Sequence, residues 1–227
     1  MTAPYRLSFT TGGLFVPEAP VVVACYLTHR DWQKTRDQVR QDKLLQVRTD
    51  AAATRISKEL IARLELLTEA ELQALQELNL RDRAYLLWAA ACRRYQLIHD
   101  FAIDVLREHH LLRRRQVTLS DYDSFYNSKA LWHPELDALA PATQSKLRQN
   151  LFRMLREADL LSAQHLIQPA LPSPYLAQLL AQQGPEQLLI FPATEMDIQR
   201  WLTCPQNSAR KAAKPRWPSG LNICSQS

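Results

Sequence analysis

The spacing of glycine and proline is the feature that most constrains how this chain folds. No glycine occurs between Gly13 and Gly184, and no proline occurs between Pro20 and Pro134. Because these residues are the usual breakers of helices, a stretch of 113 residues without either favours consecutive helices joined by short polar turns. The sequence therefore predicts an all-α fold.

Helix start signals divide this stretch into segments. Thr68 with Glu71 has the form of a capping box, and Asp31 and Asp50 are each suited to cap a helix that follows. Apolar residues recur at helical spacing between these signals, which indicates helices that bury one face. We expect helices at residues 17–29, 31–46, 50–67, 69–78, 81–94 and 96–112.

The character of the sequence changes after three consecutive arginines, Arg113, Arg114 and Arg115, which we call the basic run. Aromatic and capping residues follow, and prolines return. We therefore expect a helical bundle over residues 1–117 and a smaller helical domain over residues 118–204. The remaining residues, 205–227, are polar and basic, and we expect this tail to be disordered.

The second domain reads as short helices with at most a β-hairpin. We expect a helix at 121–131, a short helix opening at Pro134 and a longer one opening at Pro141. The apolar runs 165–168 and 188–191 are candidate strands, Ser173 caps a further helix, and Thr194 starts the last one. Short helix, amphipathic helix and strand in this order are typical of a winged-helix module.

The predicted helix at 142–158 is the best candidate for a nucleic-acid contact. Its apolar face is suited to packing against the core, and its other face carries donors that neutralise phosphates or bond base edges. The alternative is a solvated surface helix without a ligand. The candidate contact residues are Lys146, Arg148, Gln149, Asn150, Arg153 and Arg156.

The basic run has two interpretations. Positive side chains at the end of a helix complement the helix dipole and the last carbonyl groups, so Arg113, Arg114 and Arg115 have a structural reason to be there. They are also placed to clamp a phosphate group.

Several function classes are disfavoured. The sequence has no glycine-rich nucleotide loop, nucleophile elbow or zinc-protease motif, so we expect no enzyme. Adjacent His109 and His110 project about 100° apart on a helix and do not make a metal site, and we expect neither metal nor cofactor. The four scattered cysteines, the absence of a signal sequence and the lack of a long apolar run predict a cytoplasmic protein that does not enter a membrane.

The N-terminal residues carry a family resemblance. Residues 5–14 read YRLSFTTGGL and are similar to the S-F-T-x-G-G-L opening of the BrxA family of BREX phage-defence systems. We call the six matching residues the opening motif: Ser8, Phe9, Thr10, Gly12, Gly13 and Leu14. From its composition we expect a structural role, because the glycines allow positive φ and close backbone approach while Phe9 and Leu14 anchor the turn.

The resemblance implies an all-α protein, in part NusB-like, that binds DNA, with double-stranded DNA the expected form, and that works with other BREX proteins. Two alternatives stay open. A protein-binding scaffold would use Tyr122, Phe125 and Trp132 as an exposed interface. An RNA-binding helical bundle would use the same basic residues as the DNA-binding hypothesis.

Overall fold

The computed structural model describes residues 4–9, 11–46 and 49–203, and this part of the chain is helical, as the sequence predicts. The N-terminal helices are α1 (Ala19–His29), α2 (Trp32–Gln41), α3 (Asp50–Leu64), α4 (Glu69–Glu77) and α5 (Leu80–Arg94). Next come α6 (Gln96–Phe101), the π-helix η1 (Ala102–Arg107), α7 (Glu108–Leu111), α8 (Leu119–Ala130), α9 (Pro134–Asp137) and α10 (Pro141–Glu157). The last are α11 (Pro174–Ala181), the 3-10 helix η2 (Pro185–Leu188) and α12 (Glu195–Thr203).

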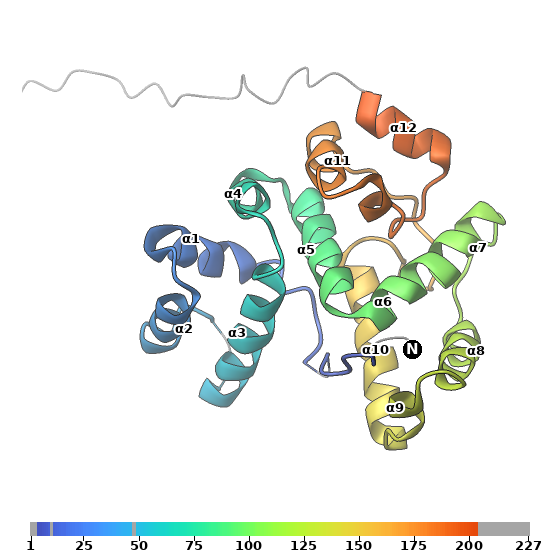
Figure 1. Cartoon of the computed structure of the whole chain (residues 1–227), viewed down its shortest axis with the longest axis horizontal. Coiled ribbons are helices and arrows are strands. Elements are labelled where there is room, and N and C mark those ends of the chain that lie inside the picture. Colours follow the sequence, from blue (N-terminus) through green and yellow to red (C-terminus); the bar gives the residue numbers. More distant parts are fainter. Residues whose placement is uncertain (1–3, 10, 47–48, 204–227) are drawn as a thin grey trace, which may run out of the picture.

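The helices are arranged around α5. Helices α1, α2 and α3 form one end of the molecule, α7, α8 and α9 lie toward the other, and α5 lies between them (Figure 1). Helix α10 packs against α5, while α11 packs against both α4 and α5. The candidate site on α10 is thus held by the central helix of the fold.

The core is built on the apolar run of α5. Every residue from Ala84 to Cys92 is buried. The indole of Trp88 donates a hydrogen bond to the carbonyl of Ile190 at 3.2 Å, and Tyr85 packs edge-on against Phe191. Because these partners lie about 100 residues further along the chain, they tie the C-terminal segment to the central helix.

Local capping residues and prolines account for where most of the helices begin. Asp31 caps α2, and Thr68 with Glu71 forms the predicted capping box of α4. Pro134 and Pro141 occupy the first turns of α9 and α10, as expected. Helix α3 differs slightly, because its cap is Thr49, whose hydroxyl accepts the amide hydrogen of Ala52, and Asp50 is the first helical residue.

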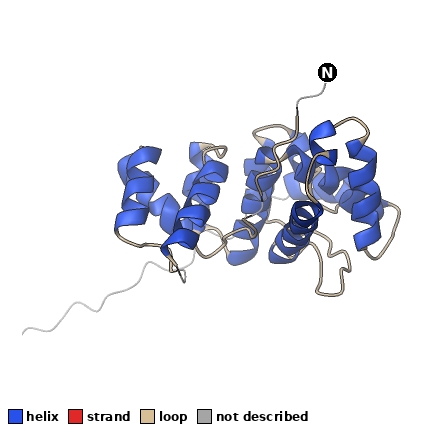
Figure 2. Ribbon diagram, turned by 90° about the horizontal axis from the view of Figure 1, so that it is seen from below, coloured by secondary structure: helices blue, strands red, loops and turns tan. Residues whose placement is uncertain are grey.

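Three other segments differ from the sequence predictions. The helix expected at 96–112 is observed as α6, η1 and α7, with a π-helical middle. Residues 188–191, a candidate strand, contain the end of η2 and a turn. Residues 165–168 contribute only isolated antiparallel bridges, Gln116 with Leu166 and Leu161 with Ile167, and Figure 2 shows no strand arrow in the described chain.

The hydrophobic core is continuous. One cluster of buried side chains extends from Tyr5 to Trp201 and crosses the boundary expected near residue 117, so the division into two domains stays a prediction. The predicted tail, residues 205–227, lies outside the described residues. Among the described helices, none has the length and apolar character that a membrane span needs.

Candidate nucleic-acid interface

One side of α10 is exposed and polar. Lys146, Gln149, Arg153 and Arg156 are all exposed, and their spacing of three or four residues places them on one face of the helix. We call these four residues the α10 exposed face. Glu157 borders this face and pairs with Arg153, and the opposite side of α10 is packed into the core through Leu147 and other apolar residues.

The side chains of the α10 exposed face make few contacts with the rest of the protein. The Lys146 ammonium donates a hydrogen bond to the Gln149 amide oxygen at 2.9 Å. Arg153 Nε donates to Glu157 Oε1 at 2.7 Å, yet the Arg153 side chain remains 57% exposed. Arg156 has no ion pair within the described part of the chain. Little has to be broken before these groups reach a ligand.

Arg148 lies away from this face. Its guanidinium donates two hydrogen bonds to the Asp123 carboxylate of α8, at 2.7 and 2.8 Å. The side chain is 30% exposed, so it links α8 to α10 at the edge of the exposed surface. A DNA contact by Arg148 would compete with this ion pair.

Asn150 differs from the sequence expectation. Its side chain is only 2% exposed, and its Nδ2 donates a hydrogen bond to the carbonyl of Phe9 at 2.9 Å. A base or phosphate cannot reach a side chain buried in this way. The amide that was expected to contact DNA instead holds the opening motif against α10.

The opening motif is clamped between α10 and the N-terminal helices. On the α10 side, the backbone N–H of Leu14 donates to Glu157 Oε2 at 2.5 Å. On the other side, Arg63 Nη1 donates to the carbonyl of Gly13 at 2.7 Å, and the Ser8 hydroxyl lies 3.3 Å from that of Tyr95. These contacts support the expected structural role; Thr10 lies outside the described residues.

The geometry explains why glycine occupies both positions 12 and 13 of the motif. A Cβ on Gly12 would lie 2.1 Å from Asn150 Oδ1, which is far below van der Waals contact. Gly13 has a φ of 116°, a backbone conformation that strains residues with a side chain. The motif therefore approaches α10 as closely as only glycine permits.

Arg63 anchors this clamp from a buried position. It is 1% exposed, forms an ion pair with Glu59 at 2.8 Å, and its guanidinium lies over the rings of Phe15 and Tyr95. The hydroxyl of Tyr95 donates to the same Glu59 carboxylate at 2.6 Å. Burial raises the pKa of Tyr95, and its hydrogen bond to Glu59 raises it further, so the hydroxyl remains a donor at neutral pH.

The basic run is exposed at the end of the α6, η1 and α7 helical stretch. Arg113 has a φ of 57°, and the Arg114 backbone N–H donates to the carbonyl of His109 at 2.8 Å. The Arg114 guanidinium also donates to His109 Nε2 at 3.2 Å, which agrees with the local structural interpretation. The carbonyl of Arg115 accepts a hydrogen bond from Ile167 at 2.8 Å, so this residue borders the bridged segments.

The bridged segments lie next to the C-terminal half of α10. The ring of His165 lies 4.9 Å from that of Phe152 on α10, and Gln116 donates to the carbonyl of Gln164 at 3.1 Å. Along the chain, Gln116 is followed by α8, α9 and α10, and the turn after α10 then brings Leu166 back to Gln116 in an antiparallel bridge. A winged helix would have strands at these positions, whereas the described residues form only isolated bridges there, so the winged-helix assignment stays a prediction.

The three aromatics of the scaffold alternative are not equivalent. Tyr122 and Phe125 are 2% and 6% exposed and pack near Phe101 in the core. They therefore cannot form an exposed interface. Trp132 is 79% exposed, as is its neighbour Leu131, in the turn between α8 and α9.

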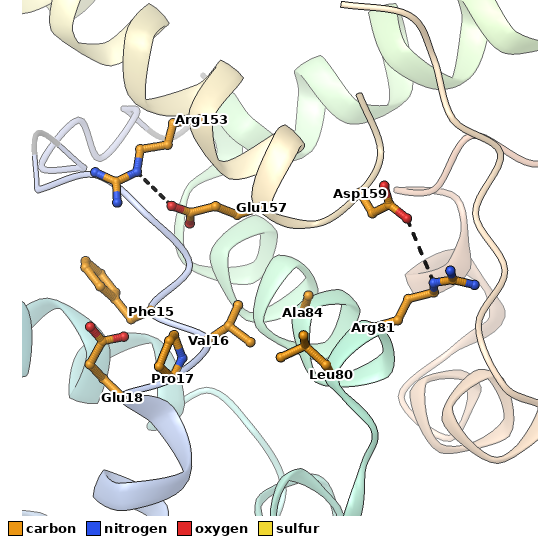
Figure 3. A pocket seen from close by; sticks show the side chains of 10 residues that line it. All are labelled: Phe15, Val16, Pro17, Glu18, Leu80, Arg81, Ala84, Arg153, Glu157 and Asp159. Carbon is orange, nitrogen blue, oxygen red and sulfur yellow. Dashed lines mark hydrogen bonds and ion pairs between the residues drawn. The ribbon is translucent and has the colours of Figure 1, made fainter. Parts of the chain in front are cut away.

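A pocket borders Arg153 at the junction of three segments. Figure 3 shows Arg153 and Glu157 of α10 facing the segment from Phe15 to Glu18, with Leu80 and Ala84 of α5 below. Its volume is about 720 Å³. Sequence reasoning missed this pocket because its walls come from segments far apart in the chain, and no local pattern signals their meeting.

The adjacent histidines and the described cysteines lie in different surroundings from the α10 exposed face. His109 is buried near Gln116 and Arg114, and His110 has a lowered pKa because of burial. Within the described residues, no group of His, Cys, Asp and Glu is arranged to hold a metal ion. The described cysteines, Cys25 and Cys92, are buried free thiols, and burial raises the pKa of both.

Comparisons with known proteins give a family. The family model of BrxA matches residues 3–184. The BREX protein BrxA of Escherichia coli O9:H4 (strain HS) is 25% identical over 147 residues, which cover 65% of this chain and 69% of that protein. A crystal structure of an uncharacterized protein from Magnetospirillum magneticum is similar with a TM-score of 0.71 at 18% identity, covering 84% of this chain and 100% of that one, which shows a shared fold.

Proposed function

This chain belongs to the BrxA family, and from that premise we propose that it binds double-stranded DNA as a non-catalytic component of a BREX phage-defence system. The α10 exposed face is the contact element. It consists of long donors on one side of a helix that the major groove can admit. Other BREX proteins are its proposed partners, and its proposed compartment is the cytoplasm.

The observation that carries this proposal is the separation of α10 into two sides. Asn150 and Glu157 hold the opening motif, and Arg148 holds α8, whereas Lys146 and Arg156 have no structural ion pair in the described chain. Two cations without a carboxylate partner among the described residues are suited to neutralise phosphates. The exposed basic run supplies a second set of phosphate contacts at the end of the preceding helical stretch.

The test is a salt titration of duplex binding, monitored by fluorescence anisotropy of a labelled duplex. Lys146→Gln/Arg156→Gln removes two charges, and Lys34→Gln/Arg200→Gln removes two exposed charges elsewhere. Binding weakens as salt rises, so the slope of log affinity against log salt is negative. We expect the first variant to make this slope shallower by about 1.8, which is about 0.9 for each of the two lost phosphate contacts. The control should change the slope little; equal slopes for all three proteins would reject α10 as the contact element.

A scaffold function has one observation in its favour, which is the exposed pair Leu131 and Trp132. Adjacent large apolar side chains in a turn are costly to leave in water and are suited to a protein partner. This candidate predicts salt-insensitive binding of purified BREX proteins from the same system, and loss of that binding in Leu131→Ser/Trp132→Ser.

A further inference from the structure

A second concave surface lies between α2 and α3, on the opposite side of the opening motif from α10. Its volume is about 1340 Å³, and Ser8 and Thr11 contribute to its lining. Gly12 and Gly13, the next residues of the motif, face α10 instead. The motif thus separates this cleft, which we call the α2–α3 cleft, from the α10 exposed face.

The α2–α3 cleft carries an excess of positive charge. Six basic and four acidic side chains line it. Three of the acids are already paired: Glu65 with Arg36 at 2.5 Å, Asp50 with Lys43 at 3.4 Å, and Glu59 with buried Arg63 at 2.8 Å. The fourth, Asp37, accepts hydrogen bonds from the Gln33 amide.

Three cations in the cleft are not neutralised in this way. Arg40, Arg55 and Lys58 are exposed and have no ion pair among residues 4–9, 11–46 and 49–203. A fourth, Arg94, donates to the carbonyl of Ala62 at 3.1 Å, and no carboxylate in the described part of the chain pairs with it. A hollow surface with several uncompensated cations concentrates anions at its mouth.

The shape and chemistry of the cleft indicate which anion it takes. Among the described residues that line it there is no aromatic side chain, so these residues offer no stacking platform for bases. Its donors are mainly guanidinium and ammonium groups, which bind phosphates without regard to sequence. A concave cleft between two helices admits a single strand more readily than the wide, convex surface of a duplex.

We propose that the α2–α3 cleft binds the phosphodiester backbone of single-stranded nucleic acid without sequence preference. Arg55 and Lys58 on α3, with Arg40 on α2, make the phosphate contacts. This site is separate from the proposed duplex contact on α10 and does not depend on it. Single-stranded DNA and RNA share the required chemistry, so the source of the strand is decided by measurement.

The experiment measures anisotropy of labelled oligothymidine and oligouridine, each of roughly 12 nucleotides, a length typical of single-strand sites. The full chain is compared with Arg55→Gln/Lys58→Gln and with the control Lys34→Gln/Arg200→Gln. We expect the cleft variant to make the slope of log affinity against log salt shallower by about 1.4, which is about 0.7 for each of the two lost contacts on a single strand. The control should leave this slope unchanged. Unaltered far-UV circular dichroism and thermal melting establish that the variants fold.

Other outcomes overturn the proposal. The cleft is not the site if the wild type binds neither oligonucleotide at about 50 mM salt. It is also not the site if Arg55→Gln/Lys58→Gln binds the oligonucleotides with the same affinity as the wild type. Competition by a polyglutamate peptide at equal charge concentration would identify a general acidic-protein surface instead. If Lys146→Gln/Arg156→Gln loses single-strand binding while Arg55→Gln/Lys58→Gln retains it, the strand binds to α10 and not to the cleft. Because duplex binding is measured separately, this proposal and the α10 proposal fail independently.

Discussion

The two sides of α10 differ in what their polar residues do, although they look alike in the sequence. On one side Asn150 and Glu157 are committed to the backbone of the opening motif. On the other, Lys146 and Arg156 make no structural ion pair within the described chain. The comparison teaches that polarity alone does not identify a binding face, because a polar side chain that satisfies a buried backbone group is part of the core.

This difference predicts that the two sides respond oppositely to substitution. Changes on the motif side should lower stability and leave intrinsic DNA affinity unaltered. Changes on the exposed face should lower DNA affinity and leave stability within about 0.5 kcal/mol of wild type.

The largest effect is expected for Gly12→Ala. The new Cβ would meet the Asn150 amide at 2.1 Å, and that amide cannot withdraw without losing its hydrogen bond to Phe9. We expect a loss of about 2–3 kcal/mol in the free energy of unfolding, measured by urea denaturation. Since the clash needs the Asn150 side chain, Gly12→Ala/Asn150→Ala should be less destabilised than the sum of the two single variants; additive losses would show that the clash is not the cause.

A smaller loss is expected for Asn150→Ala. Removing the amide leaves the buried carbonyl of Phe9 without this donor, which costs about 1–3 kcal/mol. The matched comparison is Gln149→Ala, one residue earlier on the exposed face, whose stability should hardly change. Duplex affinity, measured well below the unfolding transition, should fall for Gln149→Ala and not for Asn150→Ala. A loss of affinity in Asn150→Ala alone would show that Asn150 contacts the duplex.

Much of the fold was predictable from local signals. The absence of glycine and proline predicts the helices, and capping residues such as Thr68 and Ser173 mark where several of them begin. The hydrophobic run of α5 is recognisable as core because all of its residues from Ala84 to Cys92 are apolar. These features depend on neighbours in the chain, which a sequence displays directly.

The partners of individual polar side chains were not predictable in this way. Arg148 and Asn150 have the composition of a DNA-contacting face, yet their roles are set by Asp123 and by Phe9, which are 25 and 141 residues away. The burial of Tyr122 and Phe125 likewise depends on where α8 packs. The α2–α3 cleft gave no sequence signal, because its lining comes from segments between Ser8 and Arg94 that only the fold brings together.

Lysine footprinting tests directly whether the α10 exposed face contacts duplex DNA. The full chain is reductively methylated with and without a duplex, and the modification of each lysine is read by mass spectrometry. Lys146 belongs to the α10 exposed face, while Lys34 is exposed on α2 and serves as the internal reference. We expect the duplex to protect Lys146 from methylation and to leave Lys34 as reactive as before. Equal reactivity of Lys146 with and without bound duplex would contradict it.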